Sequence, residues 1–285
     1  PHGCNTAAFY PITSLHDEWA ELKSFRNGLA DKNIEFIVLY NSRNIRRKMP
    51  GDVVLAFKTF CDMLPKEDAD KCALLMHTQP RDDNGTDLPE LVKAVAPDAK
   101  VYFSDQKLDN KHMNFLYNMA DVTINIASNE GWGLSTTESL LTETPIIVNV
   151  TGGLQDQCGF KKEDGSYITV DDYTTEWGSN HDGRYKECGE WAKPVFPSTI
   201  SLVGSIPTPY IFDDRCRWDD AADKIKEWYD VGDDERKRCG ELGKEYAFSE
   251  KAGMTAEMMC QNFIDKMDTA FNKWTPRNRY EIFKV

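Results

Sequence analysis

The amino-acid sequence predicts an α/β fold: a Rossmann-like, doubly wound parallel sheet with helices on both faces, followed by further C-terminal helices. Two observations lead to this prediction. Runs suited to β-strands alternate with helical patterns at regular spacing between residues 34 and 153. The runs are also apolar almost throughout, as in Ile34–Tyr40, which is typical of parallel strands that are buried on both faces.

Each element is predicted from its own pattern. Short apolar or β-branched runs predict strands over Ile34–Tyr40, Cys72–His77, Lys100–Phe103, Val122–Ala127 and Ile146–Val150. Apolar residues three or four positions apart predict helices over Trp19–Leu29, Asp52–Leu64, Leu88–Ala96, His112–Met119 and Ser135–Thr142. The segment 159–210 breaks this rhythm with Pro and Gly, so we expect a long irregular insertion, such as a lid or an acceptor-side flap. Three more helices are predicted over Asp213–Asp230, Asp233–Ala247 and Gly253–Trp274.

The predicted topology also indicates where a ligand would bind. In doubly wound sheets, ligands bind outside the carboxyl ends of the strands, near the point where the strand order reverses. Arg43, Phe103, Glu130 and Gly152 each follow a predicted strand. We therefore expect them to share one edge of the sheet.

Composition limits the classes of function. The 285 residues suffice for one large or two small domains, and the 40% hydrophobic content supports a core. A net charge of −13 argues against binding along a nucleic-acid backbone, and the apolar runs are too short to span a bilayer. Eight cysteines without a CxxC pair, and no charged-then-apolar leader, predict reduced thiols and a cytoplasmic location. Because the first residue is Pro1 rather than Met, we expect a fragment or a processed chain.

The stretch Asn129–Glu138 is the centre of the functional prediction. Gly131 and Gly133 flank Trp132 in a turn between a predicted strand and the helix that follows it. Such a turn brings backbone N–H groups close to a ligand, and the helix N-terminus adds partial positive charge. The stretch therefore predicts a phosphate-binding turn.

Two carboxylates flank this turn. Glu130 would oppose anion binding, but it suits a sugar, because a carboxylate can accept two hydroxyl hydrogen bonds. Glu138 has a structural alternative, since Ser135–Glu138 has the spacing of a helix capping box. Hydroxyl acceptors on both sides of a phosphate site suit a nucleotide sugar, which has hydroxyls at both ends and a diphosphate between them.

Cations in the loop after the first strand are candidates to neutralise that diphosphate. Arg43 and Lys48 stand five positions apart there. Arg46 and Arg47 are competing candidates, whose alternative is ordinary solvated charge. No Asp-x-Asp motif follows a predicted strand, so we expect neither a metal ion nor another cofactor.

These pieces are similar to the retaining GT-B glycosyltransferases of the glycogen-synthase and mannosyltransferase-like superfamily. The E-G-W-G-L-S-T-T-E run from Glu130 to Glu138 resembles the family's E-G-F-G-L-x-x-x-E. Three further pieces occur in the family's order: a hinge-like Pro1–Gly3, a G-R…K-G-like Ser42–Lys48, and a G-T-P-V-I…G-G-like Thr144–Gly153. The resemblance covers residues 1–156, and the helices after 210 loosely.

The resemblance implies the C-terminal, donor-binding half of such an enzyme. Residues 1–14 would be a hinge, and 15–285 a nucleotide-sugar-binding domain with an insertion at about 159–210 and C-terminal helices from about 217. The acceptor-binding half would precede Pro1 or be a separate chain. Transfer would proceed with retention at the anomeric carbon.

The resemblance also implies roles for individual residues. Glu130 would hold hydroxyls of the transferred sugar and Glu138 the ribose, while Arg43 and Lys48 would neutralise the diphosphate. The backbone amides of Gly131, Trp132, Gly133 and Leu134 would lie near the sugar and the phosphate. Phe103 and Ser104 would lie where the base binds.

Departures from the family pattern and alternative functions remain. Trp132 replaces the common Phe, Thr142-Glu143 replaces a small residue followed by Gly, and Ser42 and Met49 replace glycines of the first loop. A non-catalytic nucleotide-sugar-binding module and a sugar-nucleotide epimerase are the alternatives; His112 and His181 would be the epimerase's candidate acid/base residues. The base, the sugar, the acceptor and the oligomeric state are not predicted.

Overall fold

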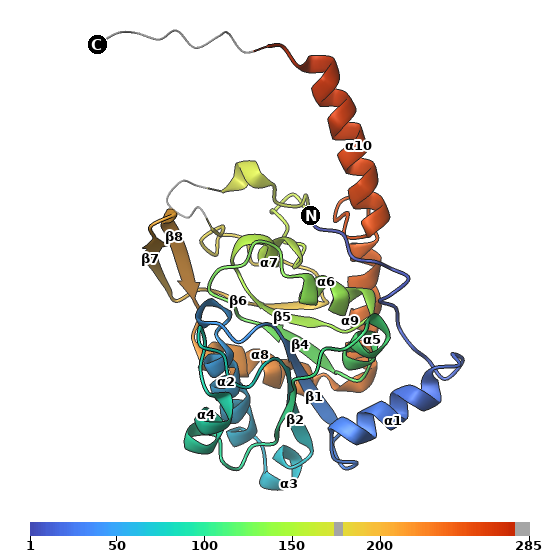
Figure 1. Cartoon of the computed structure of the whole chain (residues 1–285), viewed down its shortest axis with the longest axis vertical. Coiled ribbons are helices and arrows are strands. Elements are labelled where there is room, and N and C mark those ends of the chain that lie inside the picture. The colour runs from blue at the N-terminus through green and yellow to red at the C-terminus, as the bar shows by residue number, and fades with distance from the viewer. Residues whose placement is uncertain (174–178, 277–285) are drawn as a thin grey trace.

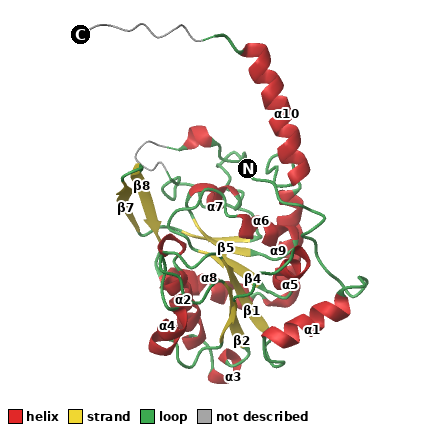
Figure 2. Cartoon of the chain, viewed as in Figure 1, coloured by secondary structure: helices red, strands yellow, loops and turns green. Residues whose placement is uncertain are grey.

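The computed structural model describes residues 1–173 and 179–276. A six-stranded sheet with the order β3-β2-β1-β4-β5-β6 forms its centre, and every neighbouring pair in it is parallel. Helices lie on both sides of this sheet, and a separate two-stranded antiparallel ribbon, β7–β8, projects from one end (Figures 1 and 2). The predicted α/β doubly wound fold is therefore confirmed.

The elements have the following bounds. The strands are β1 (Phe36–Asn41), β2 (Cys72–His77), β3 (Val101–Ser104), β4 (Val122–Asn125), β5 (Ile146–Asn149), β6 (Ala192–Val195), β7 (Thr199–Ser205) and β8 (Thr208–Arg215). The first six α-helices are α1 (Trp19–Leu29), α2 (Pro50–Asp62), α3 (Lys66–Ala69), α4 (Leu88–Val95), α5 (Asn110–Asn118) and α6 (Leu134–Leu141). The others are α7 (Gly152–Asp156), α8 (Trp218–Asp230), α9 (Gly232–Ala247) and α10 (Ala256–Lys273), with short 3₁₀ helices at Arg46–Lys48 and Val170–Asp172.

Alternate residues of the central strands serve two separate cores. Ile37 and Leu39 of β1 face the core that includes α1, α5 and α6. Val38 and Tyr40 of the same strand face the core that includes α2, α4 and α8. Both sides of β1 are therefore buried, which explains why its sequence is apolar without alternation.

The segment 159–210 contains more regular structure than the sequence indicated. Ala192–Val195 form β6, which pairs with β5 at the edge of the main sheet, and Trp191 and Val195 are buried. The helix predicted from Asp213 is wrong at its start, because Asp213–Arg215 belong to β8 and α8 begins at Trp218. Trp177, within the same segment, lies outside the described residues.

The N-terminal segment lies against the start of α10. Cys4 donates its backbone N–H to the carbonyl of Met254 (2.9 Å) and accepts from the N–H of Ala256 (2.8 Å). Beyond this contact, α10 extends away from the body of the molecule, and none of its residues is buried (Figure 1). All eight cysteines are free thiols. Among the helices of the described residues, none combines the length and apolar character that crossing a bilayer requires.

Two helical glycines give a matched test of the packing between α6 and α9. A Cβ at Gly240 of α9 would stand 1.8 Å from the carbonyl oxygen of Glu143, just after α6, whereas a Cβ at Gly28 of α1 would meet nothing within 4 Å. Gly240→Ala should therefore lower the free energy of unfolding by about 2–3 kcal/mol through overpacking. Gly28→Ala should raise it by about 0.5–1 kcal/mol. Urea denaturation of both variants measures the difference; similar midpoints would show that the two helices do not approach so closely.

Candidate donor-binding site

The strand order reverses between β1 and β4, and the loops that follow these two strands meet there. The backbone N–H and hydroxyl of Ser128, after β4, both donate to the carbonyl of Arg47, after β1 (2.8 and 3.3 Å). In doubly wound sheets this crevice is where ligands bind. The topology therefore brings the cation-rich loop against the Glu130 turn, as the sequence predicted.

The turn at the start of α6 presents backbone donors. Helix α6 begins at Leu134, after Gly133 with a left-handed backbone (φ 87°). Among the described residues, the N–H groups of Gly131, Trp132 and Gly133 donate to no backbone acceptor. Gly131 is exposed, and a Cβ there would meet no atom within 4 Å. Free N–H groups at an open helix N-terminus are a site for an anion.

The backbone of Gly152 and Gly153 packs directly against the backbone of this turn. A Cβ at Gly152, whose φ is 45°, would stand 2.0 Å from the carbonyl oxygen of Glu130, and one at Gly153 would stand 2.5 Å from that of Gly131. The N–H of Gly153 donates to the Glu130 carbonyl (3.1 Å). Side chains at these two positions would push the turn away, so the pair is required by the close approach of two backbones.

The Trp132 side chain is turned back into the protein. Its indole N–H donates to the hydroxyl of Thr137 (2.9 Å), and the ring packs against the core beside α6. The amide of Gln157 donates to the carbonyl of Trp132 (2.7 Å) and receives the Thr137 hydroxyl hydrogen (2.9 Å). The side chain of Trp132 thus holds the turn in place and leaves its backbone N–H for a ligand.

The cations after β1 differ in where they point. Lys48 pairs directly with the carboxylate of Glu130, and Arg47 donates to the carbonyl of Asn129 (2.7 Å) and lies 3.5 Å from the Glu130 carboxylate. Arg43 instead donates to Asp82 (2.9 and 3.4 Å) and is exposed. Of the candidates, Lys48 and Arg47 therefore face Glu130 and Arg43 does not. Arg47, which the sequence left as a competing candidate, is the second cation at the turn.

Lys48 and Glu130 are both largely shielded from solvent, with 13% and 10% of their side chains exposed. Burial, and to a lesser degree the Arg47 guanidinium, lower the pKa of Lys48 to about 8. The Lys48 ammonium and the Glu130 carboxylate neutralise each other, and Arg47 adds a second positive charge beside them. An incoming anion would compete with Glu130 for Lys48.

Glu138 belongs to a hydrogen-bonded chain rather than to a capping box. The capping-box alternative is wrong, because α6 starts at Leu134 and no side chain caps it. The hydroxyl of Tyr117 in α5 donates to the Glu138 carboxylate (2.5 Å), and Asn41 at the end of β1 donates to that hydroxyl (2.7 Å). Burial raises the pKa of Glu138 to about 7, and the Tyr117 hydrogen bond opposes the rise. Burial and the nearby Glu138 also hold the pKa of Tyr117 well above its usual value, so Tyr117 remains the donor.

Phe103 and Ser104 end β3, two strands from β1 along the same edge. The Ser104 hydroxyl lies 3.0 Å from Nδ1 of His77, at the end of β2. Beside them is a hollow of about 480 Å³ at the ends of β1 and β2, lined by Asn41, Ser42, Arg43, His77, Thr78 and Gln79. The buried hydroxyl of Thr78, a residue that lines this hollow, has no hydrogen-bond partner among the described residues.

Two positions that depart from the family's glycines keep a glycine-like backbone. Met49 and Glu143 both have left-handed conformations (φ 52° and 62°), which side chains other than Gly rarely adopt. Met49 packs against the core that contains α2, and Glu143 pairs with Lys244 (2.9 Å). At both positions the backbone therefore has the conformation that favours glycine, although the side chains differ.

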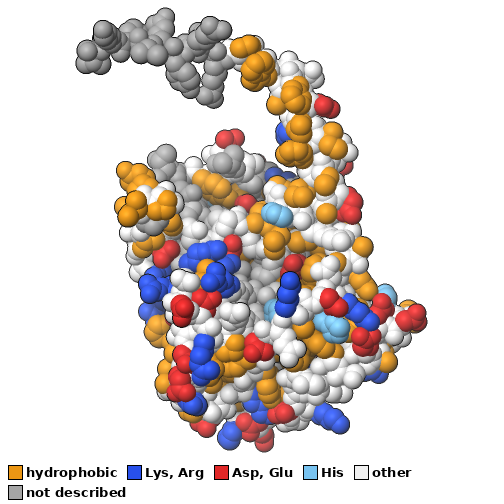
Figure 3. Space-filling model, viewed as in Figure 1, with side chains coloured by type: hydrophobic (Ala, Val, Ile, Leu, Met, Phe, Trp, Pro, Cys, Tyr) orange, Lys and Arg blue, Asp and Glu red, His pale blue; other side chains and the backbone are white. Residues whose placement is uncertain are grey.

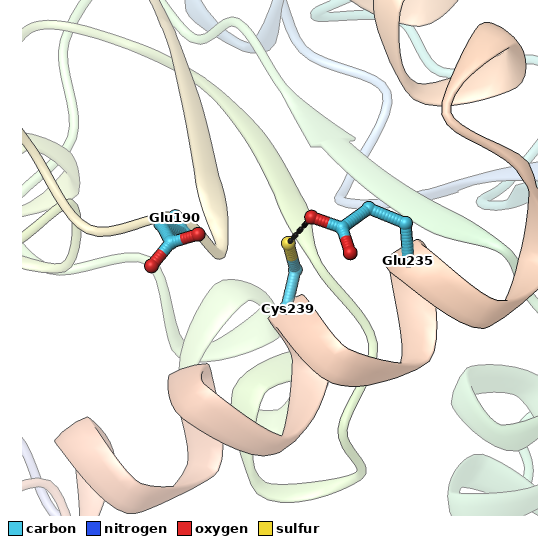
Figure 4. Close-up of side chains that lie close together, drawn as sticks. All are labelled: Glu190, Glu235 and Cys239. Carbon is cyan, nitrogen blue, oxygen red and sulfur yellow. Dashed lines mark hydrogen bonds between the residues drawn. The ribbon is translucent and has the colours of Figure 1, made fainter.

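One group of candidate metal ligands is found among the described residues, away from this turn. The ligand atoms of Glu190, Glu235 and Cys239 lie within 4.8 Å of one another, and Figure 4 shows Glu235 and Cys239 one turn apart on α9, with Glu190 opposite. Arg238 donates to both carboxylates, with 2.6 Å to Glu235. Since the Arg238 guanidinium already binds both carboxylates, the group is an ion-pair cluster and carries no metal assignment.

Comparison with known proteins agrees with the fold. No family model matches the chain. It is 27% identical over 150 residues to the alpha-monoglucosyldiacylglycerol synthase of Acholeplasma laidlawii, a match that covers 52% of this chain and 34% of that protein.

Solved structures match over nearly the whole chain. Sucrose-phosphate synthase from Thermosynechococcus elongatus has a TM-score of 0.61 at 20% identity, over 95% of this chain and 52% of that one. Anabaena HepE, solved with UDP and glucose, has a TM-score of 0.62 at 13% identity, over 94% of this chain and 55% of that one. This chain thus spans about half the length of the structures that it matches. It has the fold of one half of a GT-B glycosyltransferase.

Proposed function

We propose that this chain is the donor-binding half of a retaining, metal-independent glycosyltransferase that uses a nucleotide-diphosphate sugar. The observation that carries the proposal is the arrangement at the topological switch. Free N–H groups at the start of α6 lie between two carboxylates, Glu130 and Glu138, with the cations Lys48 and Arg47 on the Glu130 side. Donor groups for a diphosphate, flanked by acceptors for hydroxyls, match the chemistry of a nucleotide sugar.

The order of these groups along the edge of the sheet defines how the bound nucleotide sugar is oriented. The hollow at the ends of β1 and β2, with Phe103 and Ser104 beside it, takes the base. Glu138, bonded through Tyr117 to Asn41 of β1, takes the ribose hydroxyls. The amides of Gly131 to Leu134 and the cations take the diphosphate, and Glu130 takes hydroxyls of the sugar.

The chemistry follows from these roles. The bond between the anomeric carbon and the phosphate oxygen breaks, and Lys48 and the arginines neutralise the negative charge that develops on the leaving diphosphate. A leaving phosphate oxygen accepts the proton of the acceptor hydroxyl, and the new carbon–oxygen bond forms on the same face of the sugar. Fixed cations supply what a divalent ion would otherwise supply, so no metal is invoked.

The acceptor requires a second half, as a preceding domain or a separate chain. Two observations support this part of the proposal. The matched structures are about twice as long as this chain, and α10 leaves the body with Phe263, Met267 and Phe271 exposed. A helix with an apolar stripe and no buried residue is expected to pack against another part of the complete protein.

The epimerase alternative loses its candidate acid/base residues. Both ring nitrogens of the buried His181 lack partners among the described residues, its ring packs on Phe160, and burial lowers its pKa to about 4. The ring of His112 is held by Asp109 (2.7 Å) and packs against Phe25. Neither His is placed to exchange a proton with a bound sugar.

The proposal is tested first by binding. Thermal-shift and calorimetric titrations with UDP-, GDP-, ADP- and TDP-linked sugars should show one preferred donor, and EDTA should leave its affinity unchanged. With the acceptor half present, NMR of the product should show the donor's anomeric configuration retained. An inverted product would overturn the mechanism, and loss of donor binding in EDTA would overturn metal independence.

Arg43 gives a sharper test, because it reaches a diphosphate only by leaving Asp82. If Arg43 is a diphosphate ligand, Arg43→Ala should weaken binding of the nucleoside diphosphate by about tenfold and leave the nucleoside unchanged. Asp82→Asn should have the opposite effect, because it removes the carboxylate that competes for the guanidinium. Calorimetry with both ligands decides; if only Arg47→Ala causes the selective loss, Arg47 has the role expected of Arg43.

A further inference from the structure

The β7–β8 ribbon carries a cluster of exposed apolar side chains. From Thr199 to Phe212 it contains no charged residue, in a protein in which 28% of residues are charged. Leu202 is 59% exposed, Tyr210 79% and Ile206, at the turn, 101%. Such a concentration of exposed apolar side chains marks a surface that contacts something else.

Both faces of the ribbon are apolar. Leu202 and Phe212 are directly opposite each other on one face, and Val203 and Ile211 are opposite on the other. An isolated two-stranded ribbon is marginally stable in water. A protein partner would cover one face, whereas an apolar medium that receives the turn would accept both faces and the tip together.

Three arginines lie near the base of the ribbon. Arg215 at the end of β8 is half-exposed and pairs with Asp213 of the same strand (3.4 Å). Asn129 donates to the carbonyl of Phe212 (3.1 Å) and accepts the Arg47 hydrogen bond. Arg46, in the same loop, is exposed. Figure 3 shows hydrophobic side chains at the ribbon and Lys and Arg side chains next to it on the same face. An apolar tip above a basic base is complementary to anionic headgroups over an acyl layer.

We propose that the β7–β8 ribbon docks on the surface of an anionic lipid bilayer, with the turn at Ile206 in the interfacial layer. The ribbon is also tied to the candidate donor site. The N–H of Asp214 donates to the carbonyl of Ser128 (2.7 Å), and its carboxylate accepts from Thr151 (2.6 Å). Docking would therefore hold the Glu130 turn at a fixed distance from the membrane surface. Because the whole chain is acidic, the attraction is local and should weaken with salt.

Vesicle sedimentation tests the proposal. The full chain should sediment with phosphatidylcholine vesicles that contain about 30% phosphatidylglycerol, and much less with phosphatidylcholine alone. The double variant Leu202→Ser/Ile206→Ser should lower the partition coefficient by about tenfold or more, because two side chains no longer enter the interface. Both residues are exposed, so the fold should persist, as circular dichroism would check. The matched control, Phe263→Ser/Phe271→Ser, removes exposed apolar residues from α10 and should keep wild-type partitioning.

Three results would overturn the proposal. They are absence of vesicle binding by the wild type at low salt, unchanged binding of the ribbon variant, and loss of binding by the α10 variant alone. Light scattering that shows a dimer which the ribbon variant abolishes would assign the ribbon to a second copy of the chain instead. Nucleotide-sugar titration of the same samples reports separately on the proposed function, so the failure of one proposal leaves the other standing.

Discussion

Glu130→Gln should abolish sugar transfer in the complete protein and yet leave nucleoside diphosphate binding equal or severalfold tighter. In the structure the Glu130 carboxylate neutralises Lys48 and lies 3.5 Å from Arg47. A diphosphate must displace that carboxylate from the cations, and this displacement frees it to accept sugar hydroxyls. Gln keeps the shape, releases the cations and accepts hydroxyl hydrogen bonds weakly. We expect kcat to fall by about a hundredfold or more, as for the loss of a charged group that stabilises the transition state.

The difference between the effects of Glu130→Gln on the two ligands identifies the role of Glu130. Calorimetry with the nucleoside diphosphate and with the nucleotide sugar, on wild type and variant, should show that only the sugar loses affinity. Lys48→Met is the complementary control, because it should weaken both ligands while it leaves Glu130 without its partner. Unchanged turnover in Glu130→Gln, or an equal loss of both ligands, would contradict the assignment.

The sequence predicted the elements whose residues share one environment. The runs in β1, β2, β4 and β5 are buried on both faces and therefore apolar without interruption, so their type and position could be read directly. Helices α1 and α9 were predicted within a residue or so of their bounds. In each case local pattern and tertiary burial agree, which is the condition for a reliable prediction.

Strand β6 and the ribbon were missed for a physical reason. Ala192-Lys193-Pro194-Val195 contains a cation and a residue without an N–H, so it does not resemble a buried strand. It is tolerated because β6 pairs on one side only, with β5. In the ribbon, Pro207 and Pro209 suggested irregular chain. The uncharged run with Ile200 and Leu202 alternating was the signal that could have identified it.

The site was predicted as a set of loops rather than as a set of contacts. The sequence predicted that Arg43, Phe103, Glu130 and Gly152 share one edge, because parallel topology brings the carboxyl ends of strands together. It could not distinguish Arg43 from Arg47, since side-chain direction depends on Asp82 and Asn129 in other loops.

The sequence did not identify Tyr117 and Asn41 as residues of the site. Tyr117 looks like an ordinary core residue of α5, and no local pattern indicates that its hydroxyl reaches Glu138 or that Asn41 orients it. Contacts between residues far apart in the chain become visible only when the packing is known.

Glu138→Gln should stabilise the protein and weaken its binding of nucleotides. Burial raises the pKa of Glu138 from 4.5 to about 7, so the folded state holds this proton more tightly than the unfolded state. The contribution of Glu138 to stability is therefore greatest at low pH and declines as the pH rises from about 4.5 to about 7. Removing the ionisable group should raise the free energy of unfolding by about 2 kcal/mol at about pH 8, and have little effect near pH 4.5. Urea denaturation at the two pH values measures this.

In its proposed role, the same carboxylate must be ionised to accept two ribose hydroxyls. Wild-type affinity for a ribonucleoside diphosphate should therefore increase as the pH rises through about 7, and the variant should lack this dependence and bind about tenfold more weakly at about pH 8. A 2′,3′-dideoxynucleoside diphosphate offers no hydroxyls to Glu138, so the substitution should leave its affinity unchanged. If both nucleotides lose affinity equally, Glu138 acts through the turn rather than on the ribose. If the free energy of unfolding of the variant does not rise at high pH, burial of the ionised Glu138 carboxylate does not destabilise the folded protein.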